Sequence, residues 1–136
     1  MALELNGTTG VSLVQDGVIT DANLPTGSVL QVESSTGSSQ VTIGSSSFIT
    51  LSVNVSITPT STSSKILVSV SGGEIDTFAS NRAVYLSIFR NDSTNLGDAG
   101  NGFGSHWGLN SRVQIPMSME YLDSTSTTNT TTYTGY

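Results

Sequence analysis

Residues 48–58, FITLSVNVSIT, alternate apolar and polar side chains without interruption. The apolar positions are Ile49, Leu51, Val53, Val55 and Ile57, and hydroxyl or amide residues stand between them. A period of two gathers these apolar side chains on one face of a strand, whereas a helix would spread them around its circumference. The β-branched residues also favour a strand. The pattern therefore predicts a strand with one buried face and one solvent-facing face.

Three more segments show the same period. The turn-forming sequence PTSTSS (59–64) leads into KILVSVSG (65–72), which predicts a second strand. Because the connection has six residues, we expect this strand to lie antiparallel beside the first. RAVYLSIFR (82–90) predicts a third strand, with apolar side chains on both faces, and RVQIPMSMEYL (112–122) predicts a fourth. Pro116 lacks an N–H, so the fourth strand is an edge strand or contains a bulge.

Weaker alternation predicts short strands at 28–33, at 40–43 and near 131–136. No segment has a convincing helical period over three turns. The expected fold class is therefore all-β: an antiparallel β-sandwich or jelly roll at 28–136 with an extended N-terminal segment at 1–27.

The N-terminal segment has two interpretations. It forms a small hairpin with Asp16 and Gly17 at its turn, or it is an extended arm that packs on a neighbour. The sequence DANLPTG at its end predicts a linker. No secretory signal is expected, because the first residues lack a basic stretch followed by an apolar one.

Charge is scarce in this chain. Charged residues make up 10% of the sequence, compared with about 25% in ordinary globular domains, and Ser, Thr, Asn and Gly replace them. The net charge is −6, and the basic residues are scattered: Lys65, Arg82, Arg90 and Arg112. Nucleic acid binding needs clustered basic residues, so it is not expected, and neither is binding to anionic membranes. The chain has no cysteine, and no apolar run long enough for membrane insertion.

The segment GDAGNGFGSHWG (97–108) contains the one histidine and the one tryptophan of the chain. It is not a phosphate-binding loop, because no Gly-Lys-Ser/Thr sequence occurs in it. Gly102 and Gly104 begin a G-x-G pattern, but Trp107 stands where the third glycine belongs. Hydrolysis by a Ser-His-Asp triad is disfavoured because the G-x-S-x-G elbow is absent.

The sequence gives little support for a metal site or for glycoside cleavage. Zinc is disfavoured with one histidine and no cysteine. Calcium would require Asp92, Asp98 and Asn101, whose spacing matches no known calcium loop. Carboxylate pairs for glycoside cleavage are Glu74 with Asp76, or Asp98 with Glu120, but we prefer the interpretation that they are acids of a polar turn. We therefore predict no catalytic residue, no metal, no cofactor and no enzymatic activity.

We instead expect the segment to lie in a connection of about 20 residues, between the strand that ends near Arg90 and the strand that begins near Arg112. Loops of this length are usually functional or disordered. Its aromatic residues either cover the end of the domain as a lid or form a contact surface. We predict a contact surface for a host receptor or a neighbouring subunit, with Trp107 as the main anchor. The predicted contact residues are Asp98, Asn101, Phe103, His106 and Trp107.

The segments LPTGSVLQV, SSSFITLSVNVSITPTSTSSKILVSVSG, SIFRNDSTNLGDAG and MEYLDSTSTT, taken in order, carry a resemblance. Together they resemble small tail-fibre-like virion proteins of bacteriophages, especially those of phages of aquatic bacteria, over roughly 24–132. The order of strands is also similar to the trimeric jelly rolls of the tumour-necrosis-factor type.

The resemblance implies a homotrimeric virion protein, in which Tyr85 and Phe89 face the threefold axis. It implies a tail fibre or fibre tip that attaches to a host-surface glycan or protein, with the N-terminal arm bound to other virion proteins. A head decoration protein is the nearest alternative, and a polysaccharide depolymerase is a remote one. Similar proteins continue for several strands beyond the segment matching TTTYTGY, so we expect a closing strand to be missing or supplied by a neighbouring chain.

Overall fold

The computed structural model describes residues 23–77, 82–108 and 112–136. The chain divides into two units, 1–32 and 33–136. The predicted hairpin or arm at 1–22 lies outside the described residues. In the described part, every pair of neighbouring strands is antiparallel and there is no α-helix. The all-β prediction is therefore confirmed.

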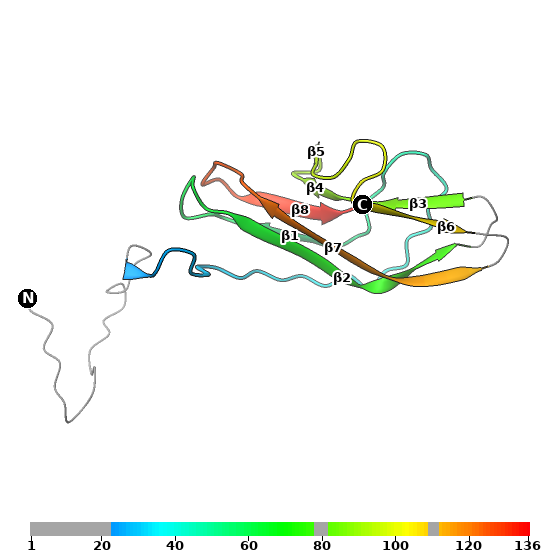
Figure 1. Ribbon diagram of the computed structural model, residues 1–136, viewed down its shortest axis with the longest axis horizontal. Helices are drawn as coiled ribbons and strands as arrows, with labels where there is room; N and C mark the ends of the chain where they lie inside the picture. The colour runs from blue at the N-terminus through cyan, green and yellow to red at the C-terminus, as the bar shows by residue number, and fades with distance from the viewer. Residues whose placement is uncertain (1–22, 78–81, 109–111) are drawn as a thin grey trace, which may run out of the picture. The chain divides into compact units, whose positions relative to one another are not determined.

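Among the described residues of the second unit, eight strands form three sheets (Figure 1). A four-stranded sheet has the order β1-β8-β4-β5, and two ribbons pair β2 with β7 and β3 with β6. The strands are β1 (Asn54–Ile57), β2 (Ile66–Thr77), β3 (Arg82–Leu86), β4 (Ile88–Arg90), β5 (Thr94–Asn95), β6 (Gly104–Gly108), β7 (Val113–Asp123) and β8 (Thr131–Gly135).

The alternation predicted for 48–58 is present, although the regular strand β1 is shorter than predicted. Val53, Val55 and Ile57 are partly buried, and the residues between them are exposed. Ser52 has a φ of 58°, which interrupts the regular strand before β1. Contact with β8 continues past this point, because the Leu51 amide donates to the Gly135 carbonyl at 2.8 Å.

The prediction that the first two strands are neighbours is wrong. β1 pairs with β8 in the register Asn54↔Thr134, whereas β2 pairs with β7 in a different sheet. Hydroxyl groups join β1 to β8 on the exposed face, including Ser56 to Thr132 at 2.7 Å. The connection at 59–64 therefore passes from one sheet to another. Six residues are enough to span the ~10 Å between packed sheets, so the length of a loop does not determine pairing.

The strand predicted at 82–90 is present but changes partners midway. Its first part, β3, pairs with β6, and its second part, β4, pairs with β8 and β5. The fully buried Ser87 stands at the break and exchanges two backbone hydrogen bonds of 2.8 Å with Tyr136. This segment thus connects a ribbon to the four-stranded sheet.

The prediction of an edge or a bulge at Pro116 is confirmed. Pro116 lies opposite Glu74, where the register of β2 against β7 shifts between Ser71 and Glu74. Gly72 and Gly73 form the irregularity with φ values of 97° and 70°, which glycine adopts without strain. The bulge thus lies in the partner strand β2, and the strand predicted at 112–122 is an edge strand, because β7 pairs with β2 alone among the described residues.

The weaker strand predictions have mixed outcomes. Residues 131–136 do form a strand, β8, but 28–33 and 40–43 are assigned to none. These two segments have brief alternation, and a strand needs a hydrogen-bonded neighbour as well as an alternating pattern. Just before them, Pro25 to Ser28 forms a turn with Gly27 at a φ of 89°, as a type II turn requires.

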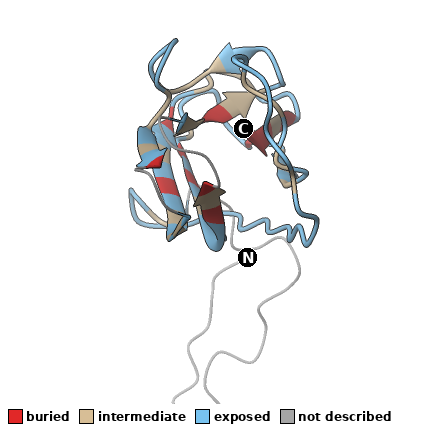
Figure 2. Cartoon of the chain, turned by 90° about the vertical axis from the view of Figure 1, so that its right-hand side faces the viewer, coloured by how far each residue is buried: buried red, intermediate tan, exposed pale blue. Residues whose placement is uncertain are grey.

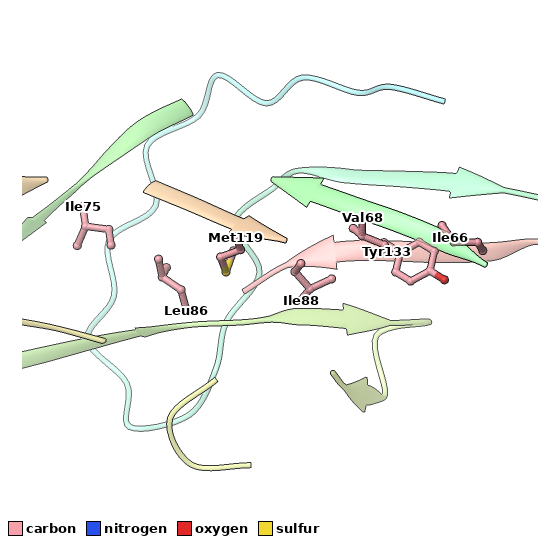
Figure 3. Close-up of a cluster of buried hydrophobic side chains, with 7 residues drawn as sticks. All are labelled: Ile66, Val68, Ile75, Leu86, Ile88, Met119 and Tyr133. Carbon is pink, nitrogen blue, oxygen red and sulfur yellow. The ribbon is translucent and has the colours of Figure 1, made fainter. Parts of the chain in front are cut away.

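The core lies between the β2–β7 ribbon and the strands β3, β4 and β8 (Figure 3). Buried positions lie on the strands, and connecting segments are mostly exposed (Figure 2). The buried apolar residues are Ile66, Val68, Ile75, Leu86, Ile88, Met119 and Tyr133.

One polar group joins three core strands. Asp123 of β7 is buried, and both of its carboxylate oxygens accept hydrogen bonds of 2.9 Å from the Arg90 guanidinium of β4. The Tyr133 hydroxyl of β8 donates to the same carboxylate at 2.8 Å. Desolvation, and then the hydrogen bond and the charge of Asp123, raise the pKa of Tyr133 well above its ordinary value of 10.0.

Val53 and Asn54 test the register of the first strand. Val53→Asp is expected to lower the free energy of unfolding by about 3 kcal/mol or more, because the new carboxylate faces apolar side chains. Asn54→Asp should change it by less than about 1 kcal/mol, because Asn54 is exposed. Urea unfolding measures both values, and equal losses would contradict the register.

The raised pKa of Tyr133 predicts that the protein loses stability at high pH. Below pH 10 its hydroxyl is protonated in both states, so the stabilisation is fully present there. As the pH rises above about 10, the unfolded chain releases this proton and the folded chain keeps it, so the free energy of unfolding falls. Tyr133→Phe should make this fall shallower, by up to about 1.4 kcal/mol per pH unit. Urea unfolding between pH 9 and 12 measures both slopes, and equal slopes would contradict the assignment.

Candidate functional site

The segment GDAGNGFGSHWG consists of a tight turn and a strand. Asp98 and Gly102 exchange backbone hydrogen bonds of 3.0 and 2.9 Å, which close the turn. The Asp98 carboxylate accepts hydrogen bonds from the amides of Asn101 at 2.8 Å and Gly100 at 3.0 Å. These bonds to the charged form, Asn101 first, lower the pKa of the exposed Asp98. The Asp98 carboxylate therefore stabilises the conformation of the turn to which it belongs.

Asn95 anchors the turn to the core, a role that the sequence analysis missed. Its side-chain oxygen accepts hydrogen bonds from the buried Ser87 hydroxyl and from the Gly97 amide. Its side-chain nitrogen donates to the Asp98 carbonyl at 3.0 Å. Asn95 is the first residue of Asn-Leu-Gly-Asp, whose composition favours a turn. This composition is the signal that could have identified the position.

Gly102 brings the turn against β3. It has a φ of 61°, and an added Cβ would collide with the Leu86 carbonyl. The next residue, Phe103, donates its amide to the same carbonyl at 2.7 Å. Glycine is therefore required here by both backbone conformation and space.

The prediction of one long connection is wrong. Residues 91–111 include β5 and β6, and β6 pairs with β3 over its full length. The register places His106 opposite Val84 and Trp107 opposite Ala83. The sequence did not predict β6 because the segment contains five glycines, and glycine is depleted in strands.

Pairing in β6 separates the predicted contact residues. Trp107 is 57% exposed, and Asp98 and Asn101 are also exposed. Phe103 is half-buried, with its ring centroid 5.5 Å from that of Tyr121 at the margin of the core. His106 is half-buried, and its Nε2 is buried with no hydrogen-bond partner among the described residues. One part of the segment thus packs inward, as a lid would, and Trp107 faces outward.

The two aromatic residues predicted at a subunit interface lie on either side of the break at Ser87, Tyr85 in β3 and Phe89 in β4. Phe89 contacts the Phe48 ring at a centroid distance of 5.6 Å and the Tyr136 ring at 4.2 Å. Tyr85 is partly buried and lines an open hollow beside β3. The structure therefore gives Phe89 aromatic neighbours within the chain.

The acidic residues that were considered for catalysis have structural partners. Asp76 forms a bidentate ion pair with Arg112, and Glu74 accepts a hydrogen bond of 2.7 Å from Gln114. Glu120 accepts one of 3.1 Å from Ser69. The hydrogen bond to Asp76, and then the charges of Asp76 and Glu74, raise the pKa of Arg112. The acids thus connect the outer faces of β2 and β7.

Asp92 also binds its own chain. Its carboxylate accepts hydrogen bonds from Thr134 at 2.6 Å and from the Tyr136 hydroxyl at 3.4 Å. Burial, followed by Asp92, raises the pKa of Tyr136. Across the described ranges, no group of three or more histidine, aspartate or glutamate residues could hold a metal ion. No helix in the described part of the chain is long and apolar enough to span a membrane.

Comparison with protein-family models, with curated proteins and with solved structures found no match. The resemblance to tail-fibre-like proteins therefore stays a prediction from the sequence.

Gly102→Ala tests whether the turn depends on close contact with β3. We expect a loss of at least about 2 kcal/mol in the free energy of unfolding, because left-handed backbone costs an L-residue about 1–2 kcal/mol and the Cβ also meets Leu86. Gly104→Ala is the matched control, because no atom lies within 4 Å of its added Cβ. Thermal unfolding compares the two, and a mild effect at both glycines would contradict this packing.

Proposed function

We propose that this protein is a structural and adhesion protein of a bacteriophage virion, a tail fibre or fibre tip that attaches to the host surface. Its function is binding, not catalysis. The sequence resemblance supports this proposal, together with a surface in which neutral hydroxyl side chains replace most charges.

In this proposal, the β domain is a jelly-roll-like sandwich that assembles as a homotrimer, and the N-terminal segment 1–27 binds other virion proteins. The antiparallel sheets on either side of one core are compatible with that architecture. Tyr85 and Phe89 contribute to the threefold contact. Phe48 and Tyr136, which pack against Phe89, enlarge the aromatic surface around it.

The observation that carries the proposal is the exposure of Trp107. An indole that is 57% exposed leaves a large apolar surface in water, and such side chains commonly anchor binding interfaces. Trp107 stands on a paired strand, so its backbone is ordered before it meets a ligand. Its ring can stack on the apolar face of a sugar. We therefore propose that a glycan of the host surface contacts β6 at Trp107.

Trp107→Ala tests this contact. We expect binding to polysaccharide extracted from the surface of a susceptible bacterium to weaken by about 2 kcal/mol or more, which is roughly 30-fold in Kd. The melting temperature should change less than it does in Val53→Asp, because Trp107 is exposed. Titration with the polysaccharide should also shift the tryptophan fluorescence of the wild type, since the chain has one tryptophan.

Ser105→Ala is the matched control, because Ser105 is also exposed and lies two residues away on the same face of β6. It should bind like the wild type. If Trp107→Ala leaves binding unchanged and lowers the melting temperature strongly, Trp107 is a structural residue and the proposed contact is wrong.

A further inference from the structure

An open hollow of about 1560 Å³ lies beside β3, in the second unit of the chain. It is lined by β2 from Val70 to Thr77, by β3 and by the segment 35–49. Pockets for small ligands usually measure about 300–1,000 Å³. The hollow is larger than this range and has apolar as well as polar lining residues, so its size favours a segment of polypeptide over a small molecule.

Two strand edges border this hollow. Among the described residues, β2 pairs with β7 alone and β3 pairs with β6 alone, so each strand has a second edge without a partner strand there. The bulge at Gly72 and Gly73 interrupts the edge of β2. The edge of β3 is regular over its five residues. A regular open edge is the usual place where an extended segment of another chain adds as a strand.

The chain itself contains a segment of the matching kind. Residues 28–33, SVLQVE, have the composition of a strand but are assigned to none. Val29 and Val32 are 78% and 79% exposed, and Leu30 is 45% exposed. Six extended residues span ~20 Å, which is enough to cover β3. Apolar side chains this exposed gain free energy when a partner covers them.

We propose that residues 28–33 of a second copy add as an antiparallel strand to the open edge of β3. The inference rests on the homo-oligomer in the proposed function and specifies its contact. Among the antiparallel registers, opposite charge favours the one in which Glu33 lies opposite Arg82, because such a cross-strand pair is stabilising. The same register places Val32 opposite Ala83 and Leu30 opposite Tyr85. Tyr85 is thus an interface residue because it packs against the added strand.

Cysteine cross-linking tests the contact in the full-length protein, because the natural chain has no cysteine. Val32→Cys and Ala83→Cys are placed in separate chains that carry affinity tags of different length, and the two chains are co-expressed and oxidised. We expect a disulfide between the two kinds of chain, since opposite residues of a strand pair lie within its reach. Val32→Cys with Leu67→Cys is the control, because Leu67 is 66% exposed on the opposite ribbon and should give no such product.

Light scattering separates this inference from the oligomer itself. The wild type is expected to have the mass of a trimer, and Val32→Asp to lower it to that of a monomer whose far-UV circular dichroism is still that of the folded wild type. A trimer without the 32–83 cross-link, or one that persists in Val32→Asp, would overturn the strand addition and leave the oligomer standing. A monomeric wild type would overturn both. If Tyr85→Ala weakens polysaccharide binding without changing the mass, a glycan occupies the hollow and the inference is also wrong.

Discussion

The ion pair between the partly exposed Arg90 and the buried Asp123, completed by the Tyr133 hydroxyl, is the interaction on which the arrangement of the sheets depends. Each partner comes from a different strand, β4, β7 or β8, and Asp123 is buried. Such a group is costly to bury unless every partner is in place, so alternative pairings of these strands would leave a buried charge without its partner. The group therefore favours one relative position of the β2–β7 ribbon and the four-stranded sheet.

That relative position also determines where the β3–β6 ribbon, which carries Trp107, lies. The fully buried Ile88 begins β4 directly after the break at Ser87, and β3, which precedes the break, has β6 as its partner. Asn95 and Gly102 then hold the turn against the same break. The exposed Trp107 is thus positioned by residues near the core and not by the glycines around it.

Period two in the sequence predicted where most strands lie, including β7 almost to its ends and β8. It could not predict which strands pair, because β1 finds β8 far along the chain and no local pattern records that choice. The site was predicted in part. The segment with the one tryptophan was identified, but β6 was missed, since glycines break its alternation. Without that strand, the opposite environments of Phe103 and Trp107 could not be distinguished. Asn95 was missed because its role depends on Ser87, which is adjacent in space only after folding.

The pairing of β1 with β8 has a consequence for how the chain folds. Ser56 and Thr132 are 76 positions apart, and β1 has no other strand partner among the described residues. Contacts of this range must pay the entropy of closing a long loop before they contribute stability, which slows folding. Until β8 arrives, the apolar face of β1 stays exposed to other chains. We therefore expect slow folding, with aggregation as the competing reaction at high concentration.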